Sequence, residues 1–94
     1  MKLHEIIEIR TSKHLQAQVE KLLKDLIEDI QSDSENRGVK LFQRMNLECD
    51  FAIQLIIDSS EVNGEGSMLG QRVTSIMKEH GIVNHSFWKE IHEK

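Results

Sequence analysis

The middle of the chain reads Phe51-Ala52-Ile53-Gln54-Leu55-Ile56-Ile57, a stretch with one polar residue. We predict a β-strand over these residues. Alternate side chains of a strand point to opposite faces, so both faces of this strand are apolar apart from Gln54. A strand of this kind lies in the centre of a sheet and is covered on both sides.

Two further strands are predicted before it. Residues 3–10 contain three β-branched isoleucines and end at the turn-like Thr11-Ser12, which is typical of a strand. Residues 39–45 alternate, with one side made of Val39, Leu41, Gln43 and Met45 and the other of Lys40, Phe42 and Arg44. Residues 46–50 are few enough to connect this strand to the next as a hairpin.

Two helices are predicted by apolar spacing. Residues 13–32 carry one apolar stripe at Leu15, Val19, Leu22, Leu23, Leu26, Ile27 and Ile30. We expect the Ser12 side chain to cap this helix, and the polar residues 32–38 to end it. After a predicted loop over residues 58–66, Ser67 is expected to cap a second helix that runs to about His80. Its shared face is Leu69, Val73, Ile76, Met77 and His80.

The last predicted element is a strand over residues 83–91, followed by a polar tail. Gly81 stands where the preceding helix ends, so we expect it to adopt the left-handed conformation that favours glycine, with Ile82 as its apolar contact. The strand carries Phe87 and Trp88 as neighbours, which must point to opposite faces.

The resulting order is β-α-β-β-α-β, which predicts an α+β chain with a ferredoxin-like fold. Two helices would lie on one face of a four-stranded antiparallel sheet. A chain of 94 residues has room for a single core, so residues 1–94 form one domain. Because two helices cover only one face, the apolar residues of the open face must meet a second subunit, a ligand or water. A sheet-to-sheet homodimer is the economical answer, and the alternative is that the open face tolerates a few exposed isoleucines.

Composition excludes several classes of function. The formal net charge of −4 argues against a dedicated nucleic-acid binder, and no apolar run approaches the roughly 20 residues that span a bilayer. One cysteine, Cys49, excludes a disulfide framework and a cysteine-rich zinc module. No secretory signal is expected at the start of the sequence. We therefore expect a cytoplasmic protein with neither nucleic acid nor membrane among its partners.

At this length and element order the chain resembles the dimeric α/β-barrel superfamily. The resemblance rests on the element order, on residues 50–58 followed by a loop and a helix, and on residues 80–88. That superfamily includes the antibiotic-biosynthesis monooxygenase-like domains and the stress-responsive A/B-barrel domains. It implies two ferredoxin-like sheets paired into a barrel-like dimer. The haem-degrading members have an Asn on the first strand, a central Trp and a His on the second helix, and here only His80 loosely corresponds.

Five residues are candidates for a ligand pocket, namely Phe42, Phe51, His80, His85 and Trp88. The aromatic residues would form the wall of an apolar site, but ordinary core or interface packing is the preferred interpretation. His80 is a weak catalytic candidate, since its place at a helix C-terminus already suits a protonated imidazole. If the first and last strands pair, His4 lies near His92 and His85 toward Arg10, which works against a three-histidine metal site. We expect neither a metal nor a cofactor.

Three functions compete at this point. The first is a small homodimer, joined by its open sheet faces, that binds a small apolar ligand between sheet and helices or has a structural role. The second, implied by the resemblance, is a cofactor-independent monooxygenase-like enzyme that acts on an aromatic or quinone-like substrate. The third is an effector-sensing module within a larger assembly.

Overall fold

In the computed structural model, which describes residues 2–31, 38–58 and 67–92, four strands form one sheet. In chain order the elements are β1 (Lys2–Arg10), a 3-10 turn η1 (Lys13–Leu15), α1 (Gln16–Gln31), β2 (Lys40–Gln43), β3 (Asp50–Asp58), α2 (Met68–Met77) and β4 (Ile82–Lys89). The strand order is β2-β3-β1-β4, and every neighbouring pair is antiparallel. The predicted ferredoxin-like α+β fold is therefore confirmed.

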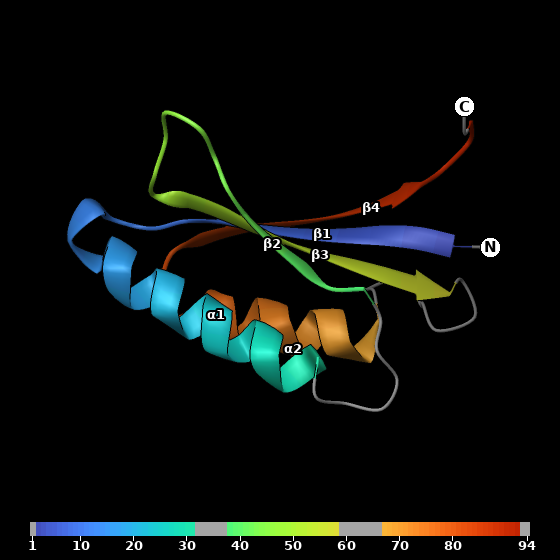
Figure 1. Cartoon of the computed structure of the whole chain (residues 1–94), viewed down its shortest axis with the longest axis horizontal. Helices are drawn as coiled ribbons and strands as arrows, with labels where there is room; N and C mark the ends of the chain where they lie inside the picture. Colours follow the sequence, from blue (N-terminus) through green and yellow to red (C-terminus); the bar gives the residue numbers. More distant parts are fainter. Residues whose placement is uncertain (1, 32–37, 59–66, 93–94) are drawn as a thin grey trace.

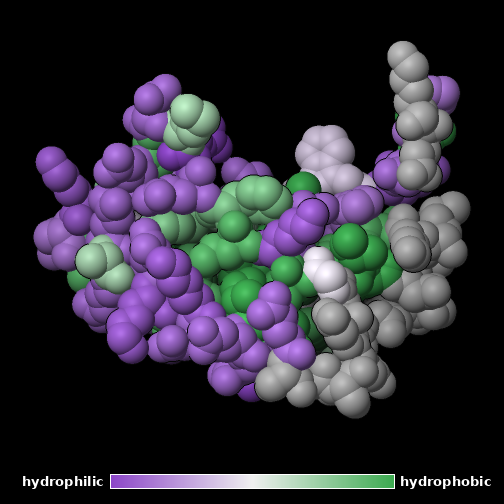
Figure 2. Space-filling model, viewed as in Figure 1, coloured by the Kyte–Doolittle hydropathy of each residue, from purple (hydrophilic) through white to green (hydrophobic). Residues whose placement is uncertain are grey.

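Both helices lie on the same side of the sheet (Figure 1). The core fills the space between these two layers, where β1 contributes Ile7 and Ile9 and α2 contributes Val73 and Met77. Strand β3 lies in the middle of the sheet, and its inward residues Phe51, Ile53, Leu55 and Ile57 are all buried. Figure 2 shows hydrophobic residues gathered between the sheet and the helix layer, with hydrophilic residues over the outer surface of the helices.

The first helix begins differently from the prediction. Ser12 precedes the 3-10 turn with an extended backbone, but its side chain makes no capping hydrogen bond. Instead its carbonyl accepts a hydrogen bond from the Leu15 amide at 3.1 Å. A 3-10 turn forms hydrogen bonds between residues three apart, so it provides an acceptor for a backbone amide that the serine side chain was expected to cap. Regular α-helix starts only at Gln16.

The prediction for Gly81 is also wrong. The only glycine with a positive φ among the described residues is Gly38, at 64°. Gly81 is required by close packing instead, since a Cβ atom there would lie 2.3 Å from the Arg10 carbonyl oxygen. Ile82, expected to pack behind it, is 78% exposed. Helix α2 ends at Met77, so His80 lies in the turn that follows.

Two strands are shorter than their patterns predict. Strand β2 stops at Gln43, because the Asp50 amide bonds the Leu47 carbonyl instead of the Arg44 carbonyl and the chain turns through Asn46, whose φ is 67°. Strand β4 ends at Lys89 rather than at residue 91. In its register His4 lies opposite Trp88, not near His92. Of the predicted loop over residues 58–66, residues 59–66 lie outside the described residues, whereas Asp58 ends β3.

The sheet has one open face. Residues paired across antiparallel strands share a face, so the register places His4, Ile6, Glu8 and Arg10 of β1 on the side away from the helices. The connection between β2 and β3 rises on this open side, and the residues after β4 turn the same way (Figure 1). The open side therefore has raised segments at both ends.

Candidate functional site

Glu5 is a carboxylate in the apolar core. It lies in the middle of β1 on the face that meets the helices, and none of its surface is exposed. The Ser67 hydroxyl donates to Glu5 Oε1 at 2.6 Å, and His85 Nε2 lies 2.5 Å from Glu5 Oε2. Both carboxylate oxygens therefore have a hydrogen-bond partner, which is the condition under which a buried charge is tolerated.

The start of α2 is shaped to hold this carboxylate. Ser67 caps the helix, as predicted, by accepting a hydrogen bond from the Gly70 amide at 2.9 Å. The Ser67 hydroxyl thus accepts a hydrogen bond from the helix and donates one to Glu5. Gly70 has no side chain because there is no room for one: a Cβ atom would lie 1.8 Å from Glu5 Oε2. The first turn of α2 therefore packs directly against the carboxylate.

The imidazole of His85 connects this buried group to the surface. His85 lies on β4 opposite Ile7 and therefore faces the helices. Its Nδ1 atom lies 3.5 Å from Thr74 Oγ1, at the outer limit of a hydrogen bond. The His85 side chain is 18% exposed, and the ring of Phe87 lies 4.8 Å from it, centroid to centroid. We call Glu5, Ser67, Thr74 and His85 the Glu5–His85 cluster.

With Glu5 ionised, the cluster selects which nitrogen of the neutral imidazole carries the proton. An ionised carboxylate only accepts hydrogen bonds, so Nε2 must donate when Glu5 carries its charge. In the neutral ring the other nitrogen, Nδ1, then holds a lone pair. A carboxylate that orients an imidazole in this way is the arrangement by which proteins prepare a histidine to take up a proton.

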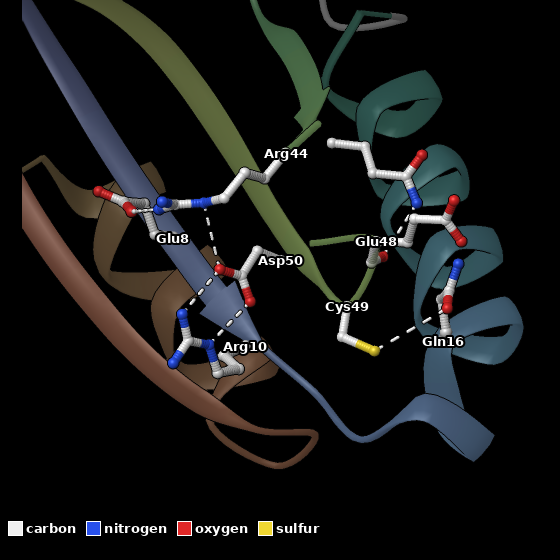
Figure 3. Close-up of polar contacts among 8 residues, drawn as sticks. Glu8, Arg10, Gln16, Arg44, Glu48, Cys49 and Asp50 are labelled. Atoms are coloured by element: carbon white, nitrogen blue, oxygen red, sulfur yellow. Dashed lines mark hydrogen bonds and ion pairs between the residues drawn. The ribbon is translucent and has the colours of Figure 1, made fainter. Parts of the chain in front are cut away.

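A second polar group lies at the hairpin end of the sheet (Figure 3). The Asp50 carboxylate accepts hydrogen bonds from Arg10 Nε and Nη2 at 2.9 and 3.0 Å. It also forms an ion pair with Arg44, whose Nε lies 3.2 Å from Asp50 Oδ2. Arg44 also approaches Glu8 at 3.5 Å. The hydrogen bonds from Arg10 hold the pKa of Asp50 below its usual value. Burial acts in the opposite direction, and the positive charges of Arg10 and Arg44 add to the lowering of the pKa. The same hydrogen bonds raise the pKa of Arg10.

A cleft of about 520 Å³ opens beside this ion-paired group. Its lining includes Arg10, Lys13 and Gln16 on one side and Leu47 and Cys49 of the hairpin on the other. The Cys49 sulfur lies 3.9 Å from Gln16 Oε1 (Figure 3). The volume is in the range of small-molecule sites.

The five predicted pocket residues do not gather at one place. Phe51 is buried in the core, whereas Phe42 and Trp88 lie on the open face and are 46% and 59% exposed. His80 contributes its carbonyl, which accepts a hydrogen bond from the Thr11 hydroxyl at 2.9 Å. Of the five, only His85 belongs to the Glu5–His85 cluster. That these residues line a ligand pocket stays a prediction.

Sequence reasoning missed two members of the cluster, Thr74 and the buried acid Glu5. Its position carries a signal, because it interrupts the inward series Leu3, Ile7 and Ile9 of β1 with an acid. An acidic residue on the apolar face of a strand needs a buried partner. The sequence does not show which residue that partner is.

Among the described residues, no group of three or more His, Cys, Asp or Glu side chains is arranged to hold a metal ion. In the same part of the chain no helix has the length and hydropathy needed to cross a bilayer. Comparisons of the chain with protein-family models, curated proteins and solved structures find no match. Function is therefore inferred from the geometry of the described residues.

Proposed function

We propose that the chain is a small homodimeric binding protein in which two sheets meet by their open faces. The observation that carries this proposal is the distribution of exposed hydrophobic side chains. Phe42, Ile82 and Trp88 lie on the open face itself. The ligand of each subunit would occupy the cleft at the hairpin end of the sheet.

The segments that rise on the open side carry further exposed hydrophobic residues. Met45 and Leu47 are on the connection between β2 and β3, and Ile91 follows β4. Together with the three on the face, six of the eight exposed large hydrophobic side chains of the described residues belong to this side. Single exposed hydrophobic residues are ordinary, but a concentration on one side marks an interaction surface.

The charges of the open face suit a second copy of itself. Asp50 is held by Arg10 and Arg44, and Glu8 by Arg44. These cations and anions nearly balance, so a two-fold contact would bring together surfaces of low net charge. An isologous dimer requires such a self-complementary surface.

Light scattering on a sizing column tests the dimer. We expect a mass of about twice the 10.9 kDa chain, and a monomer for the Trp88→Glu variant, because the introduced charge would be desolvated in the interface. Met68→Glu is the matched control, since Met68 is 86% exposed but lies on α2, in the helix layer. A monomeric wild-type protein, or equal effects of the two variants, would contradict the proposal.

A second candidate function is favoured by the Glu5–His85 cluster. A cofactor-independent monooxygenase-like enzyme acting on an aromatic or quinone-like substrate needs a base to ionise that substrate, and His85 beside Phe87 supplies both a base and an aromatic surface. In the balanced reaction the substrate gives up two hydrogens, one oxygen atom of dioxygen enters the product, and the other leaves as water. Oxygen uptake with a panel of quinols should be lost in His85→Asn and kept in His14→Asn, where the replaced histidine is exposed. No uptake by the wild-type protein would exclude this candidate.

A further inference from the structure

We propose that His85 Nδ1 is a general base for a planar ligand with an acidic hydroxyl group, and that Glu5 is the positioning residue that keeps this nitrogen unprotonated. This inference rests on the second candidate function and names its base and its class of substrate. It requires neither the dimer nor the cleft at the hairpin end.

When Glu5 is ionised, its hydrogen bonds select one tautomer of the neutral His85 ring. The Ser67 oxygen accepts from the Gly70 amide, so the single hydroxyl hydrogen of Ser67 is free to go to Glu5 Oε1. Glu5 Oε2 then requires a donor, and its neighbour within 2.5 Å is His85 Nε2. The proton of the neutral ring is thus on Nε2, and the lone pair is on Nδ1.

Nδ1 is the less firmly held of the two ring nitrogens. Its contact with Thr74 Oγ1 is 3.5 Å, a full ångström longer than the bond between Nε2 and Glu5. A ligand hydroxyl at ordinary hydrogen-bond distance would replace that contact at little cost. Catalytic hydrogen bonds are commonly long before the ligand binds and shorten in the complex.

The surroundings favour a planar ligand that becomes an anion. Phe87 lies beside the imidazole and is 38% exposed, so one aromatic ring is available for stacking. Lys89 lies two residues farther along β4 on the same face, and its side chain is exposed. An aromatic ligand on Phe87 would therefore have a base on one side and a cation on the other.

The proton balance of the step is simple. The ligand O–H bond breaks, its proton goes to Nδ1, and the electron pair stays on the ligand oxygen. The imidazolium that forms keeps its proton on Nε2 and donates that hydrogen bond to Glu5, whose negative charge offsets the new positive charge. The proton later returns to the product or to water, so the step needs no oxidant or reductant.

The Glu5→Gln variant isolates this role. The amide oxygen of Gln can accept from Ser67 as before, while its NH₂ group must donate to His85 Nε2, which moves the ring proton to Nδ1. Size and hydrogen-bond count are kept, but the base is removed. Glu28→Gln is the control, because it makes the same change on the exposed surface of α1.

The probe is 4-nitrophenol, whose ionised form is yellow, at a fixed pH where the free probe is mostly protonated. We expect the wild-type protein and Glu28→Gln to bind it and increase its phenolate absorbance, and Glu5→Gln to lose that increase. Nitrogen NMR of the imidazole rings should show the proton of His85 on Nε2 in the wild type and on Nδ1 in Glu5→Gln.

A wild-type His85 protonated on Nδ1 would overturn the inference without any variant. So would an absence of probe binding, or equal ionisation of the probe by wild type and Glu5→Gln. These outcomes are separate from the quinol assay, which decides the second candidate function. If Glu5→Gln retained quinol oxidation, that function would be supported, but the assignment of His85 Nδ1 as the base would be contradicted.

Discussion

Gly81 stands where the chain returns from α2 to the sheet, and there is no space beside it. Replacing it with alanine would place a Cβ atom 2.3 Å from the Arg10 carbonyl oxygen, and backbone atoms must move to relieve the contact. We expect Gly81→Ala to lower the free energy of unfolding by about 2–3 kcal/mol in urea titrations. Gly38→Ala is the comparison. Its added Cβ atom would meet only a side-chain atom, at 3.4 Å, and the positive φ of this residue would cost an alanine about 1 kcal/mol. Equal losses would refute the packing explanation.

Asp50 makes stability depend on pH at the acid end. Its folded-state pKa is held below the unfolded value, which is about 3.9, so its stabilising contribution is complete above that pH. As the pH falls through the folded pKa the contribution is lost, because the unfolded chain takes up the proton more readily. The decrease in unfolding free energy between pH 6 and pH 3 should therefore be smaller in Asp50→Asn than in wild type. Asp25→Asn, in an exposed pair with Lys21, should leave the decrease unchanged.

Single residues were the least predictable part of the molecule. That Gly81 serves a close approach rather than a positive φ depends on where Arg10 lies, 71 positions earlier in the sequence. The partners of Glu5 come from β4 and from the start of α2. No local pattern contains such pairings, because they arise only once strands and helices have packed.

At the scale of the elements, two serines before helices make a matched test. Ser67 accepts from the Gly70 amide and donates to the buried Glu5, so Ser67→Ala removes a cap and leaves a carboxylate oxygen without its donor. We expect a loss of about 2–4 kcal/mol of unfolding free energy. Ser12→Ala should cost less than about 0.5 kcal/mol, because the Ser12 side chain makes no cap bond. Thermal and urea unfolding of both variants would measure the difference, and similar losses would contradict it.

The periodic elements were predictable, and their ends were not. The apolar stripe of α1 and the alternation of β1 and β3 are properties of the sequence itself, and they placed these elements within a few residues. The ends depend on competing hydrogen bonds. The Asp50 amide bonds the Leu47 carbonyl instead of the Arg44 carbonyl, so pairing with β3 ends there, while the alternation of side chains continues to Met45.

At the scale of the whole molecule, the sole tryptophan reports on the proposed dimer. Trp88 is 59% exposed on the open face, so burial in a sheet-to-sheet contact would move its emission to shorter wavelengths. Dilution through the dissociation range should shift the emission of the wild-type protein to longer wavelengths. A Phe42→Glu variant should show the long-wavelength spectrum at every concentration. A spectrum that does not change on dilution while light scattering shows dissociation would place the interface elsewhere.

The position of β1 has a consequence for the synthesis of the protein. This first strand lies between β3 and β4, and Leu3 pairs with Lys89. On the ribosome β1 can pair with β3 once residues 50–58 emerge, but its other edge stays unpaired until residues 82–89 emerge. An unpaired strand edge invites pairing with other chains. This edge of β1 is therefore open to chaperones, and to misassembly, in the interval before β4 emerges.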